Sequence, residues 1–448
     1  MKYLIGLDIG TSSIKGVLMT VDGKVKKDAH ASFTYTTKDN IVEISAESFL
    51  SSCIYAIKTL ADAASDGKIC GICAASASGN LVLVDKAGNP TTPIINWQDT
   101  RVDGEPREIL GDIDLDDLYK RIGWPFGGNA FPLAQACYIK KHNPELLENC
   151  GMVAMSTEYL YYVMTGKWGI SGSAGTPFYF IDQVTGKYIP ELLEALGLDE
   201  SCFPPIMPCG SVLGTTTEEF SAKTGIPAGI PVVLGTFDHP SAARGAGILD
   251  EGELLLSCGT SWVGFFPIRD RAKIAEAKML IDPFLSPDGC WGAMTSVASV
   301  SARIKLYVDR YIAKSNTAFD TLSLLAKKSA PGAGGLSINL FDEPNDKKIL
   351  AYPKEHIARA ICEGAVNLLK AKLDALKEFG ISAESAVMVG GPSENPVLVE
   401  LISEMCGFPV KVTHGASAGA VGAAIIAGIG VGEYKDERHA QSVMKGEK

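Results

Sequence analysis

Apolar and polar positions follow two patterns along this chain, one typical of buried strands and one typical of helices that cover a sheet. The opening stretch MKYLIGLDIGTSSIKGVLMTVDG reads as a strand, a tight turn, a second strand and another turn. Strands alternating with helices further along predict layered α/β domains. The same patterns predict helices at Ser48–Ala64, Pro132–His142 and Thr157–Thr165, and strands around Ile69–Ala75 and Leu81–Val84.

The second half repeats this organisation. It opens with the strand VVLG, continues with a helix from about His239, and reaches a second strand–turn–strand in EGELLLSCGTSWVGFFP. A long helix is then predicted over Glu355–Phe379, and we expect it to lie against a sheet. Its apolar stripe comprises Ile357, Ile361, Ala365, Leu368, Leu369, Leu373 and Leu376.

The segment Phe203–Pro231 separates the halves, since its prolines and glycines break regular structure. A chain of 448 residues has a prior of about three domains, which large α/β domains reduce to two. We therefore expect a boundary just after this segment, with domains at 1–235 and 236–448.

The tripeptide Gly-Thr-Ser occurs twice, each time after an apolar strand, as Gly10-Thr11-Ser12 and Gly259-Thr260-Ser261. Such a turn can direct several backbone N–H groups and hydroxyls at one point, as an anionic phosphate requires. Two turns that face each other could hold a polyphosphate. Ordinary hairpin turns are the alternative, but the duplication and Asp8, two residues before the first glycine, favour phosphate binding.

Charge and composition argue against some classes of binding partner. The net charge of −11, without a long Lys/Arg run, argues against nucleic acid and anionic membranes. The apolar run Ala416–Gly432 is rich in alanine and glycine and shorter than the roughly 20 residues of a membrane span, so a close-packed buried helix is expected. No signal peptide is evident, and we expect a cytoplasmic protein with reduced cysteines. Cys70 and Cys73 could form a metal or redox pair, but packed thiols in a buried strand are the favoured interpretation.

Several motifs, in order and spacing, resemble the FGGY carbohydrate kinases, whose fold is shared by actin, heat-shock chaperones and hexokinase. The resemblance covers nearly the whole chain, and among these kinases the chain is similar to xylulokinases in particular. It implies two actin-like ATPase (ribonuclease H-like) α/β domains with an ATP and sugar cleft between them. The motifs are LDIGTSSIK, INWQDTR at Ile95–Arg101, GTFDHPSAA at Gly235–Ala243, LSCGTS at Leu256–Ser261, ARAICEG at Ala358–Gly364 and GGPSENP at Gly390–Pro396.

The resemblance implies ATP-dependent phosphorylation of a hydroxyl of a small carbohydrate, such as the ketopentose xylulose or a related sugar or polyol. Asp238 matches the family's general base, which takes the proton from the acceptor hydroxyl. From the residues alone, Asp238 could also be a helix N-cap, a role that does not exclude catalysis. His239 is a rival base by its chemistry, and is otherwise a substrate contact or structural.

The nucleotide contacts follow from the same resemblance. Lys15 either reaches a phosphate or is solvated, and Asp8 would hold Mg²⁺ through water, because magnesium keeps much of its hydration shell. The implied phosphate clamps are Gly10, Thr11 and Ser12 in one domain and Gly259, Thr260 and Ser261 in the other, and the implied adenosine contacts are Gly390, Gly391, Pro392 and Asn395.

The sugar site departs from the family. Xylulokinases carry a methionine and a histidine where this chain has Ser78 and Gly79, followed by Asn80. A site with this floor is expected to have room and to hydrogen-bond hydroxyls. Trp97 and Asp99 are further substrate candidates, although Trp97 could simply close the core. The loop Trp124–Phe131 is either a stacking wall for the sugar or an ordinary surface loop, and Asp238 completes the substrate contacts.

Two further departures are GGLSINLFDEP at Gly334–Pro344 and a glutamate, Glu158, at a position where the family usually has aspartate. Two other classes of protein stay open at this point: a non-catalytic ATP- and sugar-binding sensor, and a nucleotide-binding protein of the actin type. The sequence leaves open which sugar is bound, which hydroxyl reacts and whether the protein is a homodimer.

Overall fold

The computed structural model describes residues 1–448 apart from residues 78, 103, 126–130, 414–417 and 447–448. The chain forms two compact units. Unit 1 comprises Met1–Gly247, Ile281–Pro287 and Ser417–Lys448, and unit 2 comprises Ile248–Leu280 and Asp288–Ala416. The chain thus enters and leaves unit 1 more than once, and the units do not follow a single cut at 235/236.

The sheet of unit 1 is six-stranded, in the order β14-β15-β6-β1-β2-β3. Neighbours β1, β2 and β3 run antiparallel, whereas β1, β6 and β15 run parallel. The opening strand–turn–strand expected from the sequence is therefore confirmed. The strands are β1 (Lys2–Ile9), β2 (Ser13–Thr20), β3 (Val25–Ser32), β6 (Lys68–Ala75), β14 (Val212–Thr215) and β15 (Pro231–Val233).

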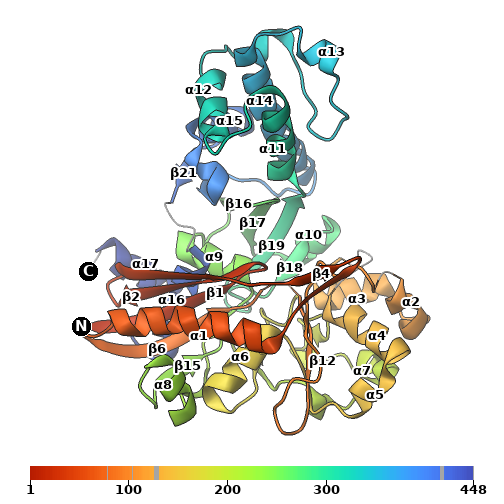
Figure 1. The fold of residues 1–448 in the computed structure, drawn as a ribbon, viewed down its shortest axis with the longest axis vertical. Coiled ribbons are helices and arrows are strands. Elements are labelled where there is room, and N and C mark those ends of the chain that lie inside the picture. The colour runs from red at the N-terminus through yellow and green to blue at the C-terminus, as the bar shows by residue number, and fades with distance from the viewer. Residues whose placement is uncertain (78, 103, 126–130, 414–417, 447–448) are drawn as a thin grey trace. The chain divides into compact units, whose positions relative to one another are not determined.

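Helix α1 (Ala46–Ala63) covers one face of this sheet, as Figure 1 shows. Ser45 precedes the helix, and its side chain accepts a hydrogen bond from the Ser48 N–H, which satisfies one free donor of the first turn. The core on this side also takes side chains from α6 (Ser156–Thr165) and α8 (Glu218–Thr224). The buried side chains of α1 recur at helical spacing: Phe49, Cys53, Ala56, Ile57 and Leu60.

Helix α16 (Ala418–Gly430) covers the other face, and its small residues allow backbone contact. A Cβ atom at Gly6 of β1 would lie 1.9 Å from the Ala420 carbonyl oxygen, and one at Gly422 would lie 1.8 Å from the carbonyl oxygen of Ser241 in α9 (Asp238–Ala246). The expected close-packed buried helix is confirmed, and it is the contact that holds α9 in unit 1. No helix in the described part of the chain has the length and hydropathy of a membrane span.

A second core of unit 1 lies under a set of short elements. Phe178, Phe180 and Phe203 form its centre, with ring centroids 5.0 to 6.0 Å apart. The elements of this part and its surroundings are β4 (Thr36–Lys38), β5 (Ile41–Ile44), β7 (Val82–Val84), β8 (Ile94–Ile95), α2 (Glu105–Leu110), α3 (Leu115–Ile122), α4 (Pro132–His142), α5 (Pro144–Glu148), β9 (Met152–Ala154), β10 (Ile170–Ser171), β11 (Ile181–Asp182), β12 (Lys187–Tyr188), α7 (Pro190–Leu196) and β13 (Ile206–Met207); α17 (Glu437–Lys445) packs beside α16.

The sheet of unit 2 has the order β18-β19-β17-β16-β20-β21, and its last five strands repeat the strand plan of unit 1. Strands β16, β17 and β19 are antiparallel neighbours, whereas β16, β20 and β21 run parallel. The expectation that one structural unit is used twice is therefore confirmed at the level of the sheets. The strands are β16 (Glu253–Cys258), β17 (Trp262–Ile268), β19 (Trp291–Val297), β20 (Ser385–Val389) and β21 (Val410–Val412), and β18 (Leu280–Asp282) spans the division between the units.

The long helix α14 (Lys354–Lys377) packs mainly against other helices, with only a minor contact with β19. The expectation that it lies against a sheet is met only at β19, and helices α11, α12 and α15 make the larger contacts. Leu368 is only half-buried, whereas the other six members of the stripe are buried. The remaining helices of unit 2 are α10 (Arg271–Glu276), α11 (Val300–Tyr311), α12 (Ala318–Ala326), α13 (Asp346–Ile349) and α15 (Pro396–Cys406).

Candidate active site

Three parallel strands of unit 1 end at one edge of the sheet, and each leads into a predicted site residue. Asp8 lies near the end of β1, directly opposite Ala75 of β6. The segments that follow β6 and β15 pair once more, since the Ser76 N–H donates to the Thr236 carbonyl at 2.8 Å. Because parallel strands present their carboxyl ends at the same edge, Asp8, the segment after β6 and Asp238 come together.

Asp238 is the first residue of α9 and is preceded by Phe237 as the N-cap residue. Its Oδ1 accepts a hydrogen bond of 2.6 Å from the His239 N–H, and its side chain is 25% exposed. Burial raises the pKa of this carboxyl group, against a smaller opposing effect of His239. The alternative that Asp238 is the N-cap is wrong. The His239 ring stands edge-on to Phe237, with Nε2 4.0 Å from Asp238 Oδ1.

A buried polar network holds the backbone just before Asp238. The Phe237 N–H donates to Ser173 Oγ at 3.2 Å, and Ser173 donates to Asp282 Oδ2 at 2.8 Å. Thr176 donates to the same oxygen at 3.2 Å. Asp282 is fully buried, and burial raises its pKa to about 7. Among the described residues its Oδ1 has no hydrogen-bond partner. This network restrains the base from a segment distant in the sequence.

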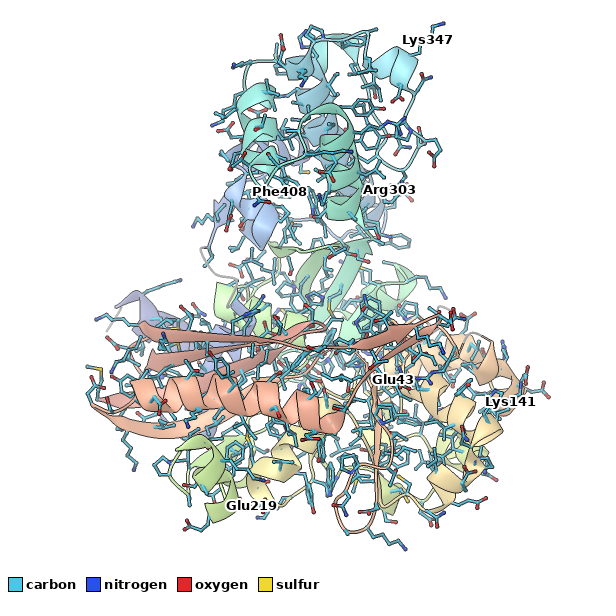
Figure 2. All side chains as sticks on the ribbon, in the orientation of Figure 1. Glu43, Lys141, Glu219, Arg303, Lys347 and Phe408 are labelled. Atoms are coloured by element: carbon cyan, nitrogen blue, oxygen red, sulfur yellow. The ribbon has the colours of Figure 1, made fainter. Side chains whose placement is uncertain are left out.

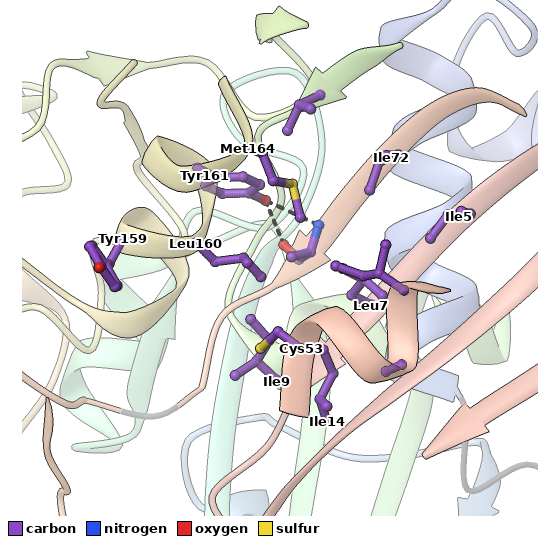
Figure 3. Packing of buried hydrophobic residues seen from close by; sticks show 14 of the residues in the cluster. Ile5, Leu7, Ile9, Ile14, Cys53, Ile72, Tyr159, Leu160, Tyr161 and Met164 are labelled. Carbon is purple, nitrogen blue, oxygen red and sulfur yellow. Dashed lines mark hydrogen bonds between the residues drawn. The ribbon is translucent and has the colours of Figure 1, made fainter. Parts of the chain in front are cut away.

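Tyr161 ties β6 to the end of β15. Its hydroxyl accepts from the Ala74 N–H at 3.1 Å, donates to the Ala74 carbonyl at 2.8 Å and accepts from the Gly235 N–H at 3.0 Å. Figure 3 shows Tyr161 reaching from α6 into the buried core, with dashed hydrogen bonds at its hydroxyl. Ser171 Oγ donates to the Gly235 carbonyl at 2.6 Å. Both backbone groups of Gly235 are thus paired, which defines the path of the chain toward Asp238.

Asp8 is half-buried between β2 and α16. Burial raises the pKa of its carboxyl group to about 7, with a further upward effect of Asp238 and a downward effect of Lys15, which lies opposite Asp8 on β2. A Cβ atom at Gly419 would lie 2.7 Å from the Asp8 carboxyl carbon, so α16 reaches this carboxyl only because residue 419 is glycine. Lys15 is therefore a neighbour of Asp8 and is half-buried rather than fully solvated.

The Gly10-Thr11-Ser12 turn is closed by bonds on both sides. The Gly10 N–H donates to the Ser13 carbonyl at 2.9 Å, and Ser12 accepts from the Phe33 N–H at 2.8 Å. Trp97 Nε1 donates to Thr11 Oγ1 at 3.0 Å. The Trp97 side chain is 36% exposed, so the interpretation that it closes the core is wrong.

Two predicted substrate contacts are engaged within the protein. Asp99 is fully buried and accepts hydrogen bonds of 2.9 Å from the Val42 N–H and from Arg101 Nε. Arg101 also pairs with Glu43, which is labelled in Figure 2. Asn80 is buried, and its Oδ1 accepts from the Ser156 N–H at 2.7 Å. These oxygens are thus engaged by groups of the protein, and the substrate contacts of Asp99 and Asn80 stay predictions. Ser78 lies outside the described residues.

Gly79 lies under the ring of Phe131. A Cβ atom at residue 79 would lie 2.2 Å from Phe131 Cδ1, so the expected room above this glycine is filled by an aromatic ring. Phe131 belongs to an aromatic cluster with Trp124, Tyr179 and Phe237, whose neighbouring centroids are 4.6 to 5.8 Å apart. The described ends of the loop Trp124–Phe131 therefore pack as a wall, and the alternative of an ordinary surface loop is wrong for them; residues 126–130 lie outside the described part.

The second Gly-Thr-Ser turn, in unit 2, is braced by the start of α11. The Gly259 N–H donates to the Ser261 carbonyl at 3.0 Å, and Ser261 Oγ accepts from the Ser299 N–H at 3.1 Å. Ser301 Oγ donates to the Gly259 carbonyl at 2.6 Å and accepts from Trp262 Nε1 at 3.1 Å. Gly259 and Thr260 are exposed. The turn is rigid and its backbone is accessible.

The glycine pair of the predicted adenosine turn follows β20 and lies against the end of β16. Gly390 has φ +95°, and a Cβ atom there would lie 2.2 Å from the Cys258 carbonyl oxygen. Gly391 has open space in place of a side chain. Asn395 caps α15, since its side chain accepts from the N–H groups of Val397 and Leu398. The turn that carries Gly391 and Pro392 is thus held next to the residues that lead to Gly259.

Sequence reasoning missed Ser173, Asp282, Tyr161 and Gly419. The small polar run SGSAGT around Ser173 and the glycine-rich run around Gly419 carry local signals, because both are compositions that allow close packing. Asp282 carries no local signal, since it meets Ser173 only through the fold.

Comparisons with known proteins agree with this architecture. The family model for the N-terminal domain of the FGGY family of carbohydrate kinases matches residues 3–245, and that for the C-terminal domain matches residues 330–431. An autoinducer-2 kinase of Klebsiella pneumoniae is 24% identical, covering 97% of this chain and 87% of its own. A xylulose kinase of Bacillus subtilis is 25% identical, covering 97% and 89%.

Among solved structures, the glycerol kinase of Plasmodium falciparum with ADP superposes with a TM-score of 0.87 at 16% identity, covering 99% of this chain and 92% of the other. This likeness shows the fold, a two-domain actin-like architecture of mixed α/β type. The duplicated sheets, the paired Gly-Thr-Ser turns and the matched family models lead to one conclusion. The chain belongs to the FGGY family of carbohydrate kinases.

Proposed function

We propose that this carbohydrate kinase transfers the γ-phosphoryl group of ATP to a hydroxyl of a small carbohydrate, such as the ketopentose xylulose or a related sugar or polyol, with Asp238 as the general base. The observation that carries the proposal is the meeting of Asp8 and Asp238 at one edge of the unit 1 sheet, where parallel strands end. In a phosphoryl-transfer site, a metal-binding carboxylate and a base are needed close together.

Asp238 suits the role of base. Its carboxylate accepts the proton of the acceptor hydroxyl while the hydroxyl oxygen forms a bond with the γ-phosphorus, and the bond to the ADP oxygen breaks. The raised pKa makes the carboxylate a stronger base than an exposed aspartate. The Ser173 and Asp282 network restrains the Phe237 backbone, so it holds the base in position. His239, whose ring packs on Phe237, is a weaker candidate.

The two Gly-Thr-Ser turns supply backbone N–H groups and hydroxyls for the phosphates, namely those of Gly10, Thr11 and Ser12 in unit 1 and of Gly259, Thr260 and Ser261 in unit 2. Gly390, Gly391 and Pro392 form the adenosine contact, with Asn395 shaping it as the cap of α15. Lys15 adds positive charge beside Asp8.

Asp8 fits a magnesium ion, since it is an oxygen donor beside the first phosphate turn and a hard cation prefers oxygen ligands. When bound, magnesium would neutralise phosphate charge. No cluster of three or more His, Cys, Asp or Glu side chains suited to a metal occurs among the described residues. The single carboxylate is in keeping with an ion that retains most of its water shell.

The relatives do not decide the acceptor. One is named for autoinducer-2, another for xylulose, and a protein of similar fold for glycerol. The candidate substrate contacts besides Asp238 are Trp97, which bonds Thr11, Gly79, which lies beneath Phe131, and Ser78, Asn80 and Asp99.

The test is ADP release from ATP and Mg²⁺ across ketopentoses, aldoses, deoxysugars, polyols and sugar acids, with Asp238→Asn and His239→Asn assayed in parallel. We expect Asp238→Asn to lower kcat by about 10²- to 10⁴-fold with ATP affinity unchanged. His239→Asn should retain most of the rate. Near-full turnover by Asp238→Asn would contradict the assignment, and ATP binding without turnover on any acceptor would favour a sensor.

A further inference from the structure

Arg244 lies in the last turn of α9, the helix that begins with the proposed base, Asp238. Its side chain is only 2% exposed, an unusual place for a guanidinium group, because a buried charge loses its hydration. This cation takes no part in the proposed transfer itself. A buried ion pair is weak evidence for stability, since well-packed apolar side chains often serve as well. The contacts of Arg244 indicate another use for its charge.

The three guanidinium nitrogens of Arg244 donate to three different segments. Nε donates to Glu437 Oε1 of α17 at 2.9 Å, and Nη2 donates to the Phe284 carbonyl at 2.7 Å. Nη1 donates to the Pro240 carbonyl, one turn earlier in α9, at 3.2 Å. Cζ also lies 4.5 Å from the centroid of the Phe284 ring. Because the group is planar and every nitrogen is engaged, its orientation is fixed.

Helix α17 holds the end of α9 that is distant from the base. Gln441 lies one turn after Glu437 in α17, and its Nε2 donates to the Arg244 carbonyl at 2.8 Å. Side chain and backbone of Arg244 are therefore both bonded to α17. Helix α17 in turn packs beside α16, in the part of Figure 1 where α9 is also labelled.

One short segment of the chain reaches both ends of α9. Asp282 accepts from Ser173, which accepts from the Phe237 N–H just before the base. Two residues after Asp282, the Phe284 carbonyl accepts from Arg244. Burial raises the pKa of Asp282, and the charge of Arg244 is among the effects that oppose this rise, so the two groups are neighbours. Arg244 thus belongs to the same buried framework that restrains the backbone at the base.

The face of α9 that meets α16 is made of small residues. A Cβ atom at Gly245 would lie 2.0 Å from the Ala418 carbonyl oxygen, and Ser241 Oγ donates to the Gly419 carbonyl at 2.8 Å. Such a contact brings the two backbones close, but it offers few large side chains whose interlocking would resist rotation or sliding. A long, fixed side chain elsewhere on the helix supplies that resistance.

We propose that Arg244, paired with Glu437, is a positioning residue that fixes the rotation and axial position of α9 and thereby the placement of Asp238. The inference rests on the proposed function and concerns the placement of its base. Misplacement of a reacting group by about 1 Å can lower a rate about a hundredfold. The pair should therefore contribute more to kcat than to stability.

The experiment replaces the pair by apolar side chains, as Arg244→Met with Glu437→Leu. No buried charge is left unpaired, so the unfolding midpoint should stay within about 5 °C of wild type. The kcat for the best acceptor should fall about tenfold to a hundredfold, with the affinity for ATP unchanged.

The matched control removes another arginine–carboxylate pair between two helices. Arg310, in the last turn of α11, pairs with Asp346 of α13 in unit 2, and both side chains are about half exposed. Arg310→Met with Asp346→Leu should change kcat by less than about twofold, since an exposed pair restrains its helices little. An equal loss of kcat in the control would overturn the special role of Arg244.

Single variants separate positioning from stability. Glu437→Leu alone leaves a buried cation without its carboxylate, so its unfolding midpoint should lie below that of the double variant. Arg244→Lys keeps the charge and loses the planar group, so kcat should fall several-fold even if its midpoint matches wild type. A kcat that simply follows the unfolding midpoint across all these variants would overturn the positioning role.

A second background shows whether Arg244 acts through the base. In Asp238→Asn, removal of the Arg244–Glu437 pair should change the remaining kcat by less than about twofold, because asparagine cannot accept the proton wherever it is placed. The same tenfold or larger loss in both backgrounds would mean that the pair acts by another route, and it would overturn the inference.

Hydrogen exchange measures the restraint without turnover. The amides of α9 should exchange faster in Arg244→Met with Glu437→Leu than in the wild-type protein, and unchanged exchange would overturn the restraint. Full kcat in this double variant, together with a slow Asp238→Asn, would overturn the positioning role alone. Absence of ADP release by the wild-type protein with every acceptor, or full turnover by Asp238→Asn, would overturn the proposed function and the positioning role with it.

Discussion

The two Gly-Thr-Ser turns have the same residues and the same kind of hairpin, yet they differ in what surrounds them. The turn of unit 1 follows Asp8 by two residues, whereas the turn of unit 2 follows Ser257. The first is closed by Trp97 and by Phe33, which follows β3, and the second is braced by serines at the start of α11. In the described part of the chain, the carboxyl groups whose pKa burial raises all belong to unit 1: Asp8, Glu158, Asp238 and Asp282.

This difference shows that the two copies of a duplicated fold can present different functional groups. Both units retain a turn that presents backbone N–H groups, because anion binding needs only the backbone path. Acidic chemistry is confined to unit 1, whose sheet edge gathers Asp8 and Asp238. We therefore propose that unit 1 supplies metal and base while unit 2 supplies neutral nucleotide contacts.

The largest expected effect comes from replacing the residue that stands two positions before each Gly-Thr-Ser turn, Asp8 in unit 1 or Ser257 in unit 2. Asp8→Asn should lower kcat by about a hundredfold or more, since it removes a ligand charge worth several kcal/mol in a metal-assisted transfer. Ser257→Ala should change kcat less than threefold. The measurement is kcat over a magnesium series, with unfolding midpoints to verify both folds. Equal losses would show that the two turns do not divide the work in this way.

Next in size is the pH dependence of stability that Asp282 contributes. Its pKa is raised from 3.8 to about 7, mainly by burial, with Asp238 adding to the rise and Ser173, Arg244 and Thr176 opposing it. Between these values the folded state binds more protons than the unfolded state, so stability falls as pH rises. The stability of Asp282→Asn relative to wild type should therefore increase as pH rises from 4 to 8, by on the order of 2 kcal/mol in total.

Urea unfolding at several pH values measures this difference. Asp374→Asn in unit 2 is the control of opposite sign, since hydrogen bonds from Lys370 and Lys377 lower the pKa of Asp374. Its contribution is present at neutral pH and is lost as pH falls below the ordinary aspartate range. The same pH trend in both variants would contradict the contrast between the units.

A smaller effect is expected from the braces of the two turns. Ser301→Ala should cost about 1–2 kcal/mol of stability, because it leaves the buried Trp262 Nε1 and the Gly259 carbonyl without their partner. Trp97→Phe should cost less than about 1 kcal/mol, since Thr11 is exposed enough to bond water instead. Thermal or urea unfolding measures both. A larger loss in Trp97→Phe would reverse the ranking.

The last comparison tests whether both turns bind phosphate through an open backbone. A Cβ atom at Gly10 would lie 3.3 Å from the Ser13 carbonyl oxygen, and one at Gly259 would lie 3.9 Å from the Ser261 carbonyl oxygen. Neither glycine has a positive φ. Alanine should thus change stability little while it weakens ATP binding by about tenfold, through contact with phosphate. Calorimetric titration of ATP measures this, and unchanged affinity in Gly259→Ala would remove unit 2 from the phosphate site.

Much of the fold could be predicted from periodicity. The strand–turn–strand at Gly10 and its repeat at Gly259 were evident because strands of alternating or continuous apolar residues with a small-residue turn have few other solutions. The buried helix α16 was evident from its alanine and glycine content. The placement of α14 was not, because an apolar stripe specifies burial and does not specify whether the partner is a sheet or other helices.

The candidate site was predictable only in part. Asp8 and Asp238 could be named from their motifs, and the structure brings them to one sheet edge. Asp99 and Asn80 were equally polar in the sequence, but buried pairing with Arg101 and with the Ser156 N–H engages their oxygens. Whether a polar side chain faces a ligand or holds a loop depends on partners distant in the chain.

The sequence by itself determined the local conformations: apolar runs made strands, small residues made the tight turns, and periodic stripes made the helices, since each follows from contacts over a few residues. Only the tertiary structure decided the rest. It joined α9 and α16 into unit 1, linked Asp282 to the backbone before the base, and laid Phe131 over Gly79. These are packing choices among distant segments, determined by which surfaces exclude water together and which buried polar groups find partners.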